Sequence, residues 1–594
     1  MKAKSSQYSL WSYVLAHRGQ VVQGTLLVAA SVAITVSAPF ITRFAIDALV
    51  DGSATWPKII GYAVLYLGAV ALSAIMALGM RKILLSLGHQ VEYEVRRDLF
   101  ARLALLDYYF YSRERTGDLM TKMTSDLNAV REFVGQGILQ GARTTIGFLL
   151  AFGVMFAINT QLALVMLFLL PATSVLFFLL LSIIRRRYEE TQAQFSRISN
   201  FCQESFAGIR TVRGYGIEDR YNSLFAGLNE HYIALKMALS RVERPLWPVM
   251  GMFFSFGVVL ILWVGGRQVI AGQLTVGEFV QFSQYLFILQ WPMLALGWTV
   301  NLLQRGLGSW DRIRAILDAE PQIKDAPTDG SSTKALSLTT PLTSQEPDAV
   351  SFKHVTLCLG GVEVLKGIDL QVPKGQTLGI TGPTGSGKTL LAMLIARLLD
   401  PTSGQVLVKG CDVREMRLGE LRALIGMAPQ EAFLFSDTLA NNIAFGLEDT
   451  NPDIVFAAAE LAELHTDVKA FPDQFETLLG ERGVTLSGGQ RQRAAISRAL
   501  ARDPEILILD DVFSAIDTQT EAAIQARFQS FLTSRTTLII SHRISSLRHA
   551  NRIIVLQDGR ITQAGTHREL IQMPGYYREL DEIQRLQAEL EHTP

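Results

Sequence analysis

The stretch GPTGSGKT, residues 382–389, decides the fold of the second half of this chain. It matches the pattern G-x-x-x-x-G-K-[ST], with a strand-like segment before it and an apolar helical segment, TLLAMLIARLL, after it. Glycines let backbone N–H groups close on phosphate oxygens, and the N-terminus of the following helix adds positive potential. The pattern therefore predicts an α/β nucleotide-binding domain built around this loop.

The residues of this loop have separate predicted roles. The Lys388 ammonium reaches the β- and γ-phosphates of ATP, and the Thr389 hydroxyl is a ligand for Mg²⁺. The remaining phosphate-binding positions are Gly382, Pro383, Thr384, Gly385, Ser386 and Gly387. ATP and Mg²⁺ are therefore the predicted ligands.

Downstream, LILDDVFSAID at 507–517 places two adjacent carboxylates after an apolar run. Alone, such a run indicates only a strand that meets a turn. After a P-loop it indicates more, because a strand ending in Asp holds Mg²⁺ in these proteins and the next acid polarises the attacking water. Asp510 is the predicted metal ligand, and Asp511 is the predicted catalytic acid.

A second anion-binding sequence, LSGGQ at 486–490, lies between these two motifs and opens a helical segment, RQRAAISRAL. Backbone N–H groups and a hydroxyl at a helix start favour an anion. One ATP does not need two such cradles in one subunit. The sequence therefore predicts a head-to-tail pair in which each ATP lies between one P-loop and the partner's LSGGQ.

The composition indicates a membrane protein. The 594 residues are 49% hydrophobic and 19% charged, with a mean hydropathy of +0.24. The formal net charge is zero, which excludes a nucleic-acid binder held by bulk charge, and the three cysteines lack metal-ligand spacing. Six predicted spans lie near residues 19–47, 57–80, 134–158, 160–184, 246–270 and 277–303.

Charge orients these spans. The short connections carry no Lys or Arg, whereas 81–131 and 185–244 are basic, so both long loops and both termini are predicted to be cytoplasmic. Gly-containing breaks at 115–119 (RTGDL) and 213–220 (RGYGIEDR) fit either ordinary helix turns, which the residues alone favour, or short transverse helices, which the resemblance described below implies. The predicted domains are a transmembrane domain at 1–317, a linker rich in Pro, Ser and Thr at 318–349, and a nucleotide-binding domain at 350–594.

Taken together, the P-loop, MAPQ, LSGGQ, LILDD, SAID and LIISHR resemble the motifs of an ATP-binding cassette in order and spacing. With six upstream spans, the chain resembles an ABC half-transporter of the exporter type, particularly the bacterial multidrug-resistance-like subunits that form heterodimers. The resemblance implies an α-helical six-span transmembrane domain fused to an α/β P-loop ATP-binding cassette domain.

The resemblance also implies residue roles. Gln430 contacts Mg²⁺ and the lytic water, and His542 holds the γ-phosphate of the chain's own ATP. Asp517 sits across the dimer seam. The residues implied to bind the partner's nucleotide are Ser487, Gly488, Gly489 and Gln490.

Two positions depart from the family pattern, and both belong to one site. The family usually has Glu where this chain has Asp511, and a carboxylate that is misplaced by about 1 Å can slow a reaction on the order of 10²-fold. The family also usually has an aromatic residue against adenine where this chain has Leu359. The site on this chain's own P-loop is therefore predicted to be impaired beside an intact LSGGQ, which favours a heterodimer. The alternative is a homodimer in which Asp511 is active enough.

The cargo is less constrained by sequence. In or near the spans the charged residues noted are Arg43, Asp47 and Arg143, so a strongly anionic cargo is not indicated, and aromatic residues suit amphipathic drug-like, peptide or lipid cargo. The leading hypothesis is an ATP-driven exporter in the inner (plasma) membrane. An importer of a small molecule such as a metal chelate, built on the same architecture, is the alternative. A mechanical or repair ATPase that also uses LSGGQ is disfavoured by the six spans.

Overall fold

The structure is a computed structural model that describes residues 8–325, 348–480, 483, 485–532 and 535–591. The chain divides into two compact units. Unit 1 comprises Met1–Leu106 and Glu114–Glu320, and unit 2 comprises Asp107–Arg113 and Pro321–Pro594.

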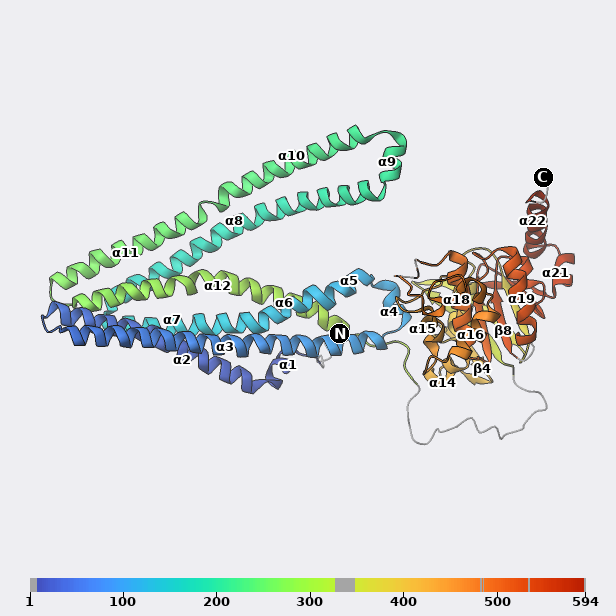
Figure 1. The fold of residues 1–594 in the computed structure, drawn as a ribbon, viewed down its shortest axis with the longest axis horizontal. Helices are drawn as coiled ribbons and strands as arrows, with labels where there is room; N and C mark the ends of the chain where they lie inside the picture. The colour runs from blue at the N-terminus through green and yellow to red at the C-terminus, as the bar shows by residue number, and fades with distance from the viewer. Residues whose placement is uncertain (1–7, 326–347, 481–482, 484, 533–534, 592–594) are drawn as a thin grey trace. The chain divides into compact units, whose positions relative to one another are not determined.

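The regular secondary structure of unit 1 is entirely helical in its described residues (Figure 1). Its helices are α1 (Leu10–Ala16), α2 (Arg18–Val50), α3 (Trp56–Leu105), α5 (Thr116–Thr121), η1 (Lys122–Asp126), α6 (Leu127–Glu132), η2 (Phe133–Gly137), α7 (Ile138–Ile158), α8 (Thr160–Ala207), α9 (Ile209–Tyr215), α10 (Glu218–Glu243), α11 (Leu246–Ile270) and α12 (Val276–Leu317).

Within the described ranges, six helical segments are long and apolar enough to cross a membrane, which confirms the predicted fold class. These segments extend well beyond the predicted spans, since α3 has 50 residues and α8 has 48. A bilayer core needs only about 20 residues of helix. The apolar windows therefore continue into polar helix at one end, as expected from the helical spacing of the long loops.

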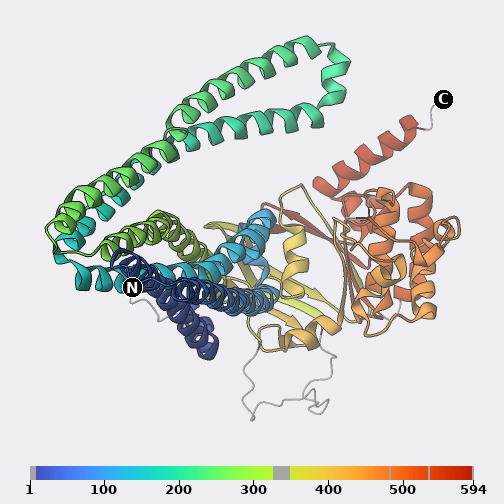
Figure 2. The same cartoon turned by 60° about the vertical axis from the view of Figure 1, so that its left-hand side comes forward.

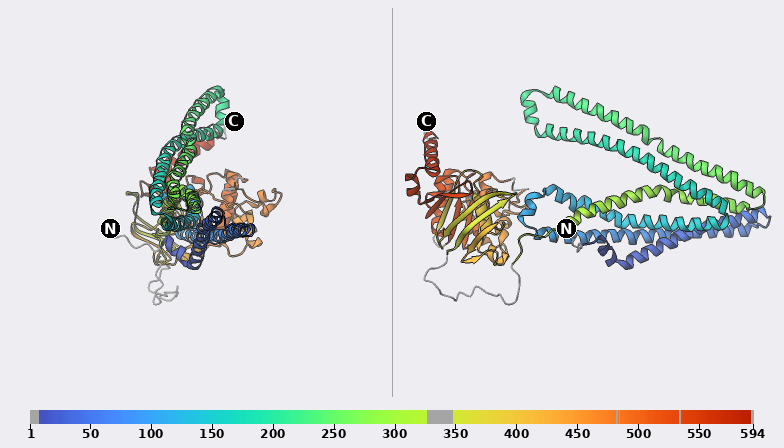
Figure 3. Two further views of the ribbon diagram at one scale, coloured as in Figure 1. Left: turned by 90° about the vertical axis from the view of Figure 1, so that its left-hand side faces the viewer. Right: turned by 180° about the vertical axis from the view of Figure 1, so that it is seen from behind.

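Four of these helices, α2, α3, α7 and α12, pack side by side along much of their length (Figures 1 and 3). Helices α8 and α10 run beside each other as a long hairpin that α9 closes (Figures 1 and 2). Side-chain caps fix some helix starts. Asn159 accepts a hydrogen bond from the Leu162 N–H at the start of α8, and Thr275 and Glu278 form a capping box at α12.

The position predicted for the first transverse helix is wrong. RTGDL forms the first turn of the segment α5 to α7, and the separate short helix of this loop is α4 (Tyr108–Arg113). Helix α4 belongs to unit 2, where the Tyr109 ring packs against the apolar core. Burial of this ring raises the pKa of Tyr109. Helix α4 is therefore anchored by the aromatic side chain of Tyr109, whereas the sequence prediction was based on the glycine in RTGDL. In the second loop, α9 ends at Tyr215, and the following Gly216, with a φ of 63°, terminates the helix.

Helix α12 ends at Leu317 and strand β1 begins at Val350. Most of the predicted linker, residues 326–347, lies outside the described residues, so its character stays a prediction.

Unit 2 contains two sheets. The four-stranded sheet has the order β2-β1-β4-β5, and the six-stranded sheet has the order β10-β9-β3-β8-β7-β6. The strands are β1 (Val350–Leu359), β2 (Val362–Val372), β3 (Thr377–Thr381), β4 (Ser403–Val408), β5 (Cys411–Asp412), β6 (Ile425–Ala428), β7 (Ile506–Asp510), β8 (Thr536–Ile540), β9 (Arg552–Gln557) and β10 (Arg560–Gly565).

The larger sheet decides where the site lies. Strands β6, β7, β8, β3 and β9 are parallel to their neighbours, so their carboxyl ends meet at one edge. β7 and β8 are buried along their whole length, because one face shares a core with α13 (Lys388–Ile395) and strands of the smaller sheet, and the other face shares a core with α18 (Gly488–Ala501) and other helices. The other helices of unit 2 are α14 (Leu418–Ala423), α15 (Leu439–Ile443), η3 (Ala444–Gly446), α16 (Pro452–Leu461), α17 (His465–Val468), η4 (Gln474–Glu476), α19 (Thr518–Leu532), α20 (Ile544–Leu547), α21 (His567–Gln572) and α22 (Tyr576–Glu591).

Candidate nucleotide-binding site

The glycine-rich loop connects β3 to α13, and its curvature depends on glycine. Gly382, Gly385 and Gly387 have φ values of 148°, 82° and 101°, which residues other than glycine rarely adopt. A Cβ atom at Gly382 would lie 2.0 Å from the carbonyl oxygen of Leu556. The loop can therefore hold this conformation only with glycine at that position.

Lys388 is the first residue of α13 and is 8% exposed. Its ammonium donates hydrogen bonds to the carbonyl oxygens of Gly382 (2.9 Å) and Pro383 (2.8 Å). Burial lowers the pKa of Lys388, and the carboxylates of Asp511 and Asp510 act in the opposite direction. A phosphate would compete well for this ammonium, because bonds between two charged groups are stronger than bonds to neutral carbonyls.

The loop region also contains hydroxyl groups that form no hydrogen bond within the protein. The Ser386 hydroxyl and, just before the loop, the Thr381 hydroxyl are buried and have no hydrogen-bond partner. Unpartnered buried hydroxyls are uncommon in folded proteins. Ser386 lies within the curve of the loop, so the residues present fit a bound phosphate.

Strand β7 delivers the two adjacent carboxylates. Asp510 is 2% exposed and Asp511 is 8% exposed. Burial raises the pKa of Asp510, and a hydrogen bond with the Thr389 side chain opposes this rise. A carboxylate beside a hydroxyl supplies oxygen ligands of the kind Mg²⁺ prefers. Asp510 and Thr389 therefore fit the metal role predicted for them.

Asp511 stands at a bend directly after the strand. Its φ is 48°, a left-handed conformation that Asp tolerates better than most residues, and its N–H donates to the Ile540 carbonyl oxygen at 2.8 Å. Its carboxylate accepts a long hydrogen bond, 3.5 Å, from the Gln430 amide. The short acid is thus held among the predicted catalytic groups.

Gln430 and His542 come from the neighbouring strand ends, after β6 and β8 respectively. Burial lowers the pKa of His542, and the nearby Lys388 lowers it further. The imidazole is therefore neutral at physiological pH and can donate one N–H. The cavity that contains these groups has a volume of about 280 Å³ and is lined by Val364, Thr384, Gly385, Gly387, Lys388, Thr389, Leu390, Gln430, Asp510, Asp511, Ile540 and His542.

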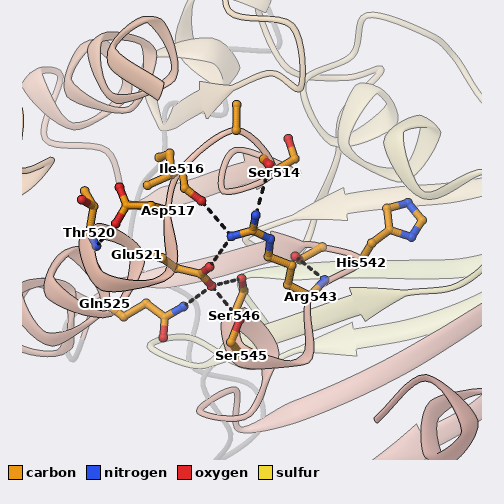
Figure 4. Close-up of polar contacts among 12 residues, drawn as sticks. Ser514, Ile516, Asp517, Thr520, Glu521, Gln525, His542, Arg543, Ser545 and Ser546 are labelled. Atoms are coloured by element: carbon orange, nitrogen blue, oxygen red, sulfur yellow. Dashed lines mark hydrogen bonds and ion pairs between the residues drawn. The ribbon is translucent and has the colours of Figure 1, made fainter. Parts of the chain in front are cut away.

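The residue after His542 connects this cavity to the loop at 514–517 (Figure 4). The Arg543 guanidinium donates to the carbonyl oxygens of Ser514 (3.2 Å) and Ile516 (2.9 Å) and to the Glu521 carboxylate (2.8 Å). Glu521 is 2% exposed and also accepts hydrogen bonds from Gln525, Ser545 and Ser546. Arg543 is therefore fixed in place between the β8 edge and this loop.

The other predicted binding residues lie outside the cavity. Ser487 caps α18 and forms a capping box with Gln490, whose amide also donates to Asp467. Gly488 and Gly489 form the first turn of α18. Asp517 caps α19 by accepting a hydrogen bond from the Thr520 N–H, and this bond lowers the pKa of Asp517. Leu359 ends β1 and is not among the residues that line the cavity.

Sequence reasoning did not identify Arg543 or Glu521. Arg543 immediately follows His542 in LIISHR, but a basic residue after a strand does not indicate its partner. The neighbours of Glu521 along α19 are mostly exposed, so the sequence gives no sign of its burial, which arises from tertiary packing.

Comparisons with known proteins agree with this geometry. Residues 21–293 match the family described as ABC transporter transmembrane region, and residues 365–514 match the family described as ABC transporter. The multidrug resistance-like ATP-binding protein MdlA of Escherichia coli (strain K12) is 34% identical over 553 residues, which cover 92% of each chain.

Two further similarities concern cargo and structure. The ATP-dependent lipid A-core flippase of Desulfotalea psychrophila is 34% identical over 502 residues, covering 84% of this chain and 86% of the flippase. The structure of a bacterial Atm1-family ABC exporter with ATP bound superposes with a TM-score of 0.76 at 26% identity, covering 96% of this chain and 98% of that chain.

Proposed function

Because the chain belongs to the ABC exporter-type half-transporters, which carry a transmembrane domain and an ATP-binding domain in one polypeptide, we propose that it is one subunit of a heterodimeric, ATP-driven exporter whose own P-loop site turns over slowly. The observation that carries this proposal is the position of Asp511. A short acid lines the cavity that also contains Lys388, Gln430 and His542, where the family usually has Glu.

The residues of the cavity support separate roles in ATP hydrolysis. Lys388 and the glycine-rich loop bind the phosphates, and Thr389, Asp510 and Gln430 hold Mg²⁺, which supplies positive charge against the phosphate oxygens. Asp511 accepts a proton from the attacking water, and neutral His542 donates a hydrogen bond to the terminal phosphate. A carboxylate that is one methylene short holds that water poorly, which is why this site is slow.

The exposed cap at Ser487 supports the pairing with another subunit. Ser487, Gly488 and Gly489 lie outside the chain's own cavity and present a helix N-terminus of the kind that binds anions. We assign them to the partner's ATP, and we place Asp517 at the seam. The partner's ATP then contacts this chain's intact LSGGQ, whereas the site on this chain's P-loop has the short acid.

The proposed direction of transport and the proposed class of cargo are based on the relatives. A multidrug resistance-like protein and a lipid A-core flippase support the export of amphipathic molecules across the inner membrane. The basic loops support cytoplasmic termini and a cytoplasmic nucleotide-binding domain.

Co-purification of two differently tagged copies tests whether the transporter is a heterodimer. Two copies of the full chain with different affinity tags would be expressed together in the source cell, and the membranes would be solubilised and captured on one tag. The proposal predicts that the second tag stays behind while a different half-transporter is recovered. Equal recovery of both tags would establish a homodimer and overturn the proposed pairing.

A further inference from the structure

A second cavity lies in unit 1. It has a volume of about 530 Å³, within the usual range of ligand pockets. Its walls come from α3, η2, α7, α8, α11 and α12. The lining residues that matter here are Arg81, Arg143, Gln140, Trp247, Trp291 and Trp298.

The charge of this cavity is unbalanced. Arg81 and Arg143 both line it, and no Asp or Glu does. Among the described residues, neither guanidinium forms an ion pair. A charged side chain within a membrane segment is costly, and such residues usually pair with one another or mark a substrate path. The two arginines thus provide positive charge that the protein itself does not neutralise.

Other arginines of unit 1 show what a structural role looks like. Arg43 forms ion pairs with Asp47 and Glu278, and Arg312 pairs with Asp126, which is 5% exposed. Another cavity of unit 1, of about 610 Å³, contains the Arg312–Asp126 pair, so its charges are balanced. By contrast, the cavity of about 530 Å³ keeps its positive charge available.

The remaining walls favour a hydrophobic body. Trp247, Trp291 and Trp298 are 62%, 62% and 45% exposed, so much of each indole surface is open to a ligand. Indoles offer large apolar area and a polar N–H edge. Gln140 is buried, at 7% exposure, and adds an amide to the wall.

We propose that this cavity binds the transported molecule and that the cargo is an amphipathic organic anion, with a phosphate or carboxylate head against Arg81 and Arg143 and an apolar body against the three tryptophans. The proposal rests on the proposed function, since it names the class of cargo for that exporter. It differs from the expectation that a strongly anionic cargo is not indicated. That expectation did not count Arg81, which lies one residue beyond the predicted span, and sequence does not reveal which arginines lack a partner.

Matched probes test the charge of the head. The full transporter in nanodiscs of zwitterionic lipid would be titrated with dodecyl phosphate, dodecyltrimethylammonium and dodecyl maltoside, with tryptophan fluorescence as the readout. Dodecyl phosphate should bind at least about tenfold more tightly than the other two, since hydrogen bonds to charged groups are worth about that factor. Equal binding of the ammonium probe would overturn the proposal.

Substitutions of the two cavity arginines test their role in binding. Arg143→Gln and Arg81→Gln should each weaken dodecyl phosphate binding about tenfold or more, and Arg143→Lys should retain most of it. Arg186→Gln, an exposed arginine on α8 outside the cavity, should leave binding unchanged. Unchanged binding in both cavity variants, with melting temperatures like that of the wild type, would overturn the proposal.

Two further arms separate the alternatives. The titration would be repeated with 1-naphthyl phosphate, which has an aromatic body and no alkyl chain. Tight binding of this probe would indicate a soluble aromatic anion as cargo, whereas binding of dodecyl phosphate alone would indicate a lipid-like anion. ATP hydrolysis measured in the same samples separates this inference from the function it rests on. If the wild-type transporter hydrolyses ATP but does not prefer the anionic probe, the cavity assignment alone is overturned. If the wild-type transporter does not hydrolyse ATP, the proposed function is overturned.

Discussion

The contact between Arg543 and the loop at 514–517 makes a prediction that separates catalysis from nucleotide binding. Arg543→Ala removes the cation from buried Glu521 and two donors from the loop carbonyls. Losing one partner of a buried pair costs about 3–5 kcal/mol. The Arg543 side chain is 32% exposed, and solvent screening reduces the expected loss of unfolding free energy to about 2 kcal/mol.

The functional effect should appear in kcat. The loop that begins after Asp511 loses its anchors, whereas Lys388 and the glycine-rich loop are untouched. We therefore expect kcat for ATP to fall about tenfold, the equivalent of roughly 1.4 kcal/mol, with KM changed less than twofold. The assay is steady-state hydrolysis in nanodiscs, over a range of ATP concentrations, by the assembled transporter whose partner site has been inactivated, so that turnover reports on this chain's own site.

A second variant keeps this reasoning open to refutation. Arg543→Ala combined with Glu521→Gln removes the stranded charge, so melting temperature should recover in part while kcat stays low. Arg568→Ala, an exposed arginine on α21, serves as the control. A raised KM at unchanged kcat, or a double variant that restores kcat, would refute the anchoring role of Arg543.

Three other changes have defined outcomes. Lys388→Ala should weaken nucleotide binding to this chain's own site and leave measurable ATP turnover in the complex; complete loss of turnover in an assembled complex would argue against unequal sites. Ser487→Ala and Gly488→Asp should reduce turnover more than Lys388→Ala, because they disable the cradle offered to the partner's site, and an equal or smaller loss would favour a homodimer. Gly277→Ala places a Cβ 2.5 Å from the Arg43 carbonyl oxygen and should lower stability by about 1–3 kcal/mol, whereas Gly266→Ala, with no atom within 4 Å, should not, as thermal melts would reveal.

The sequence predicted the features that depend on local pattern. Apolar windows about 20 residues long located the six membrane-crossing segments, because span length is set by the bilayer. The P-loop and LILDD predicted neighbouring strand ends, because parallel strands meet at one edge of a sheet. Lys388, Asp510 and His542 accordingly line one cavity.

Features that depend on distant packing could not be predicted. Tyr109 anchors α4 through contacts with residues far along the chain, so the glycine in RTGDL gave a misleading position. Glu521 is buried only because Arg543 and two serines converge on it. Whether an arginine has a carboxylate partner likewise depends on helix packing, which is why Arg143 and Arg43 look alike in sequence but differ in the structure.

The central claim is that Asp511 limits the site on this chain's P-loop. The direct test is single-site turnover of the complex after the partner's own site has been inactivated at its catalytic acid, comparing wild type, Asp511→Glu and Asp511→Asn. Glu extends the carboxylate without changing charge, so hydrolysis should rise, by up to about 10²-fold. Asn keeps the length and tolerates the left-handed backbone, and it should abolish hydrolysis. Hydrolysis that is already fast with Asp511 and unchanged by Glu would contradict the account.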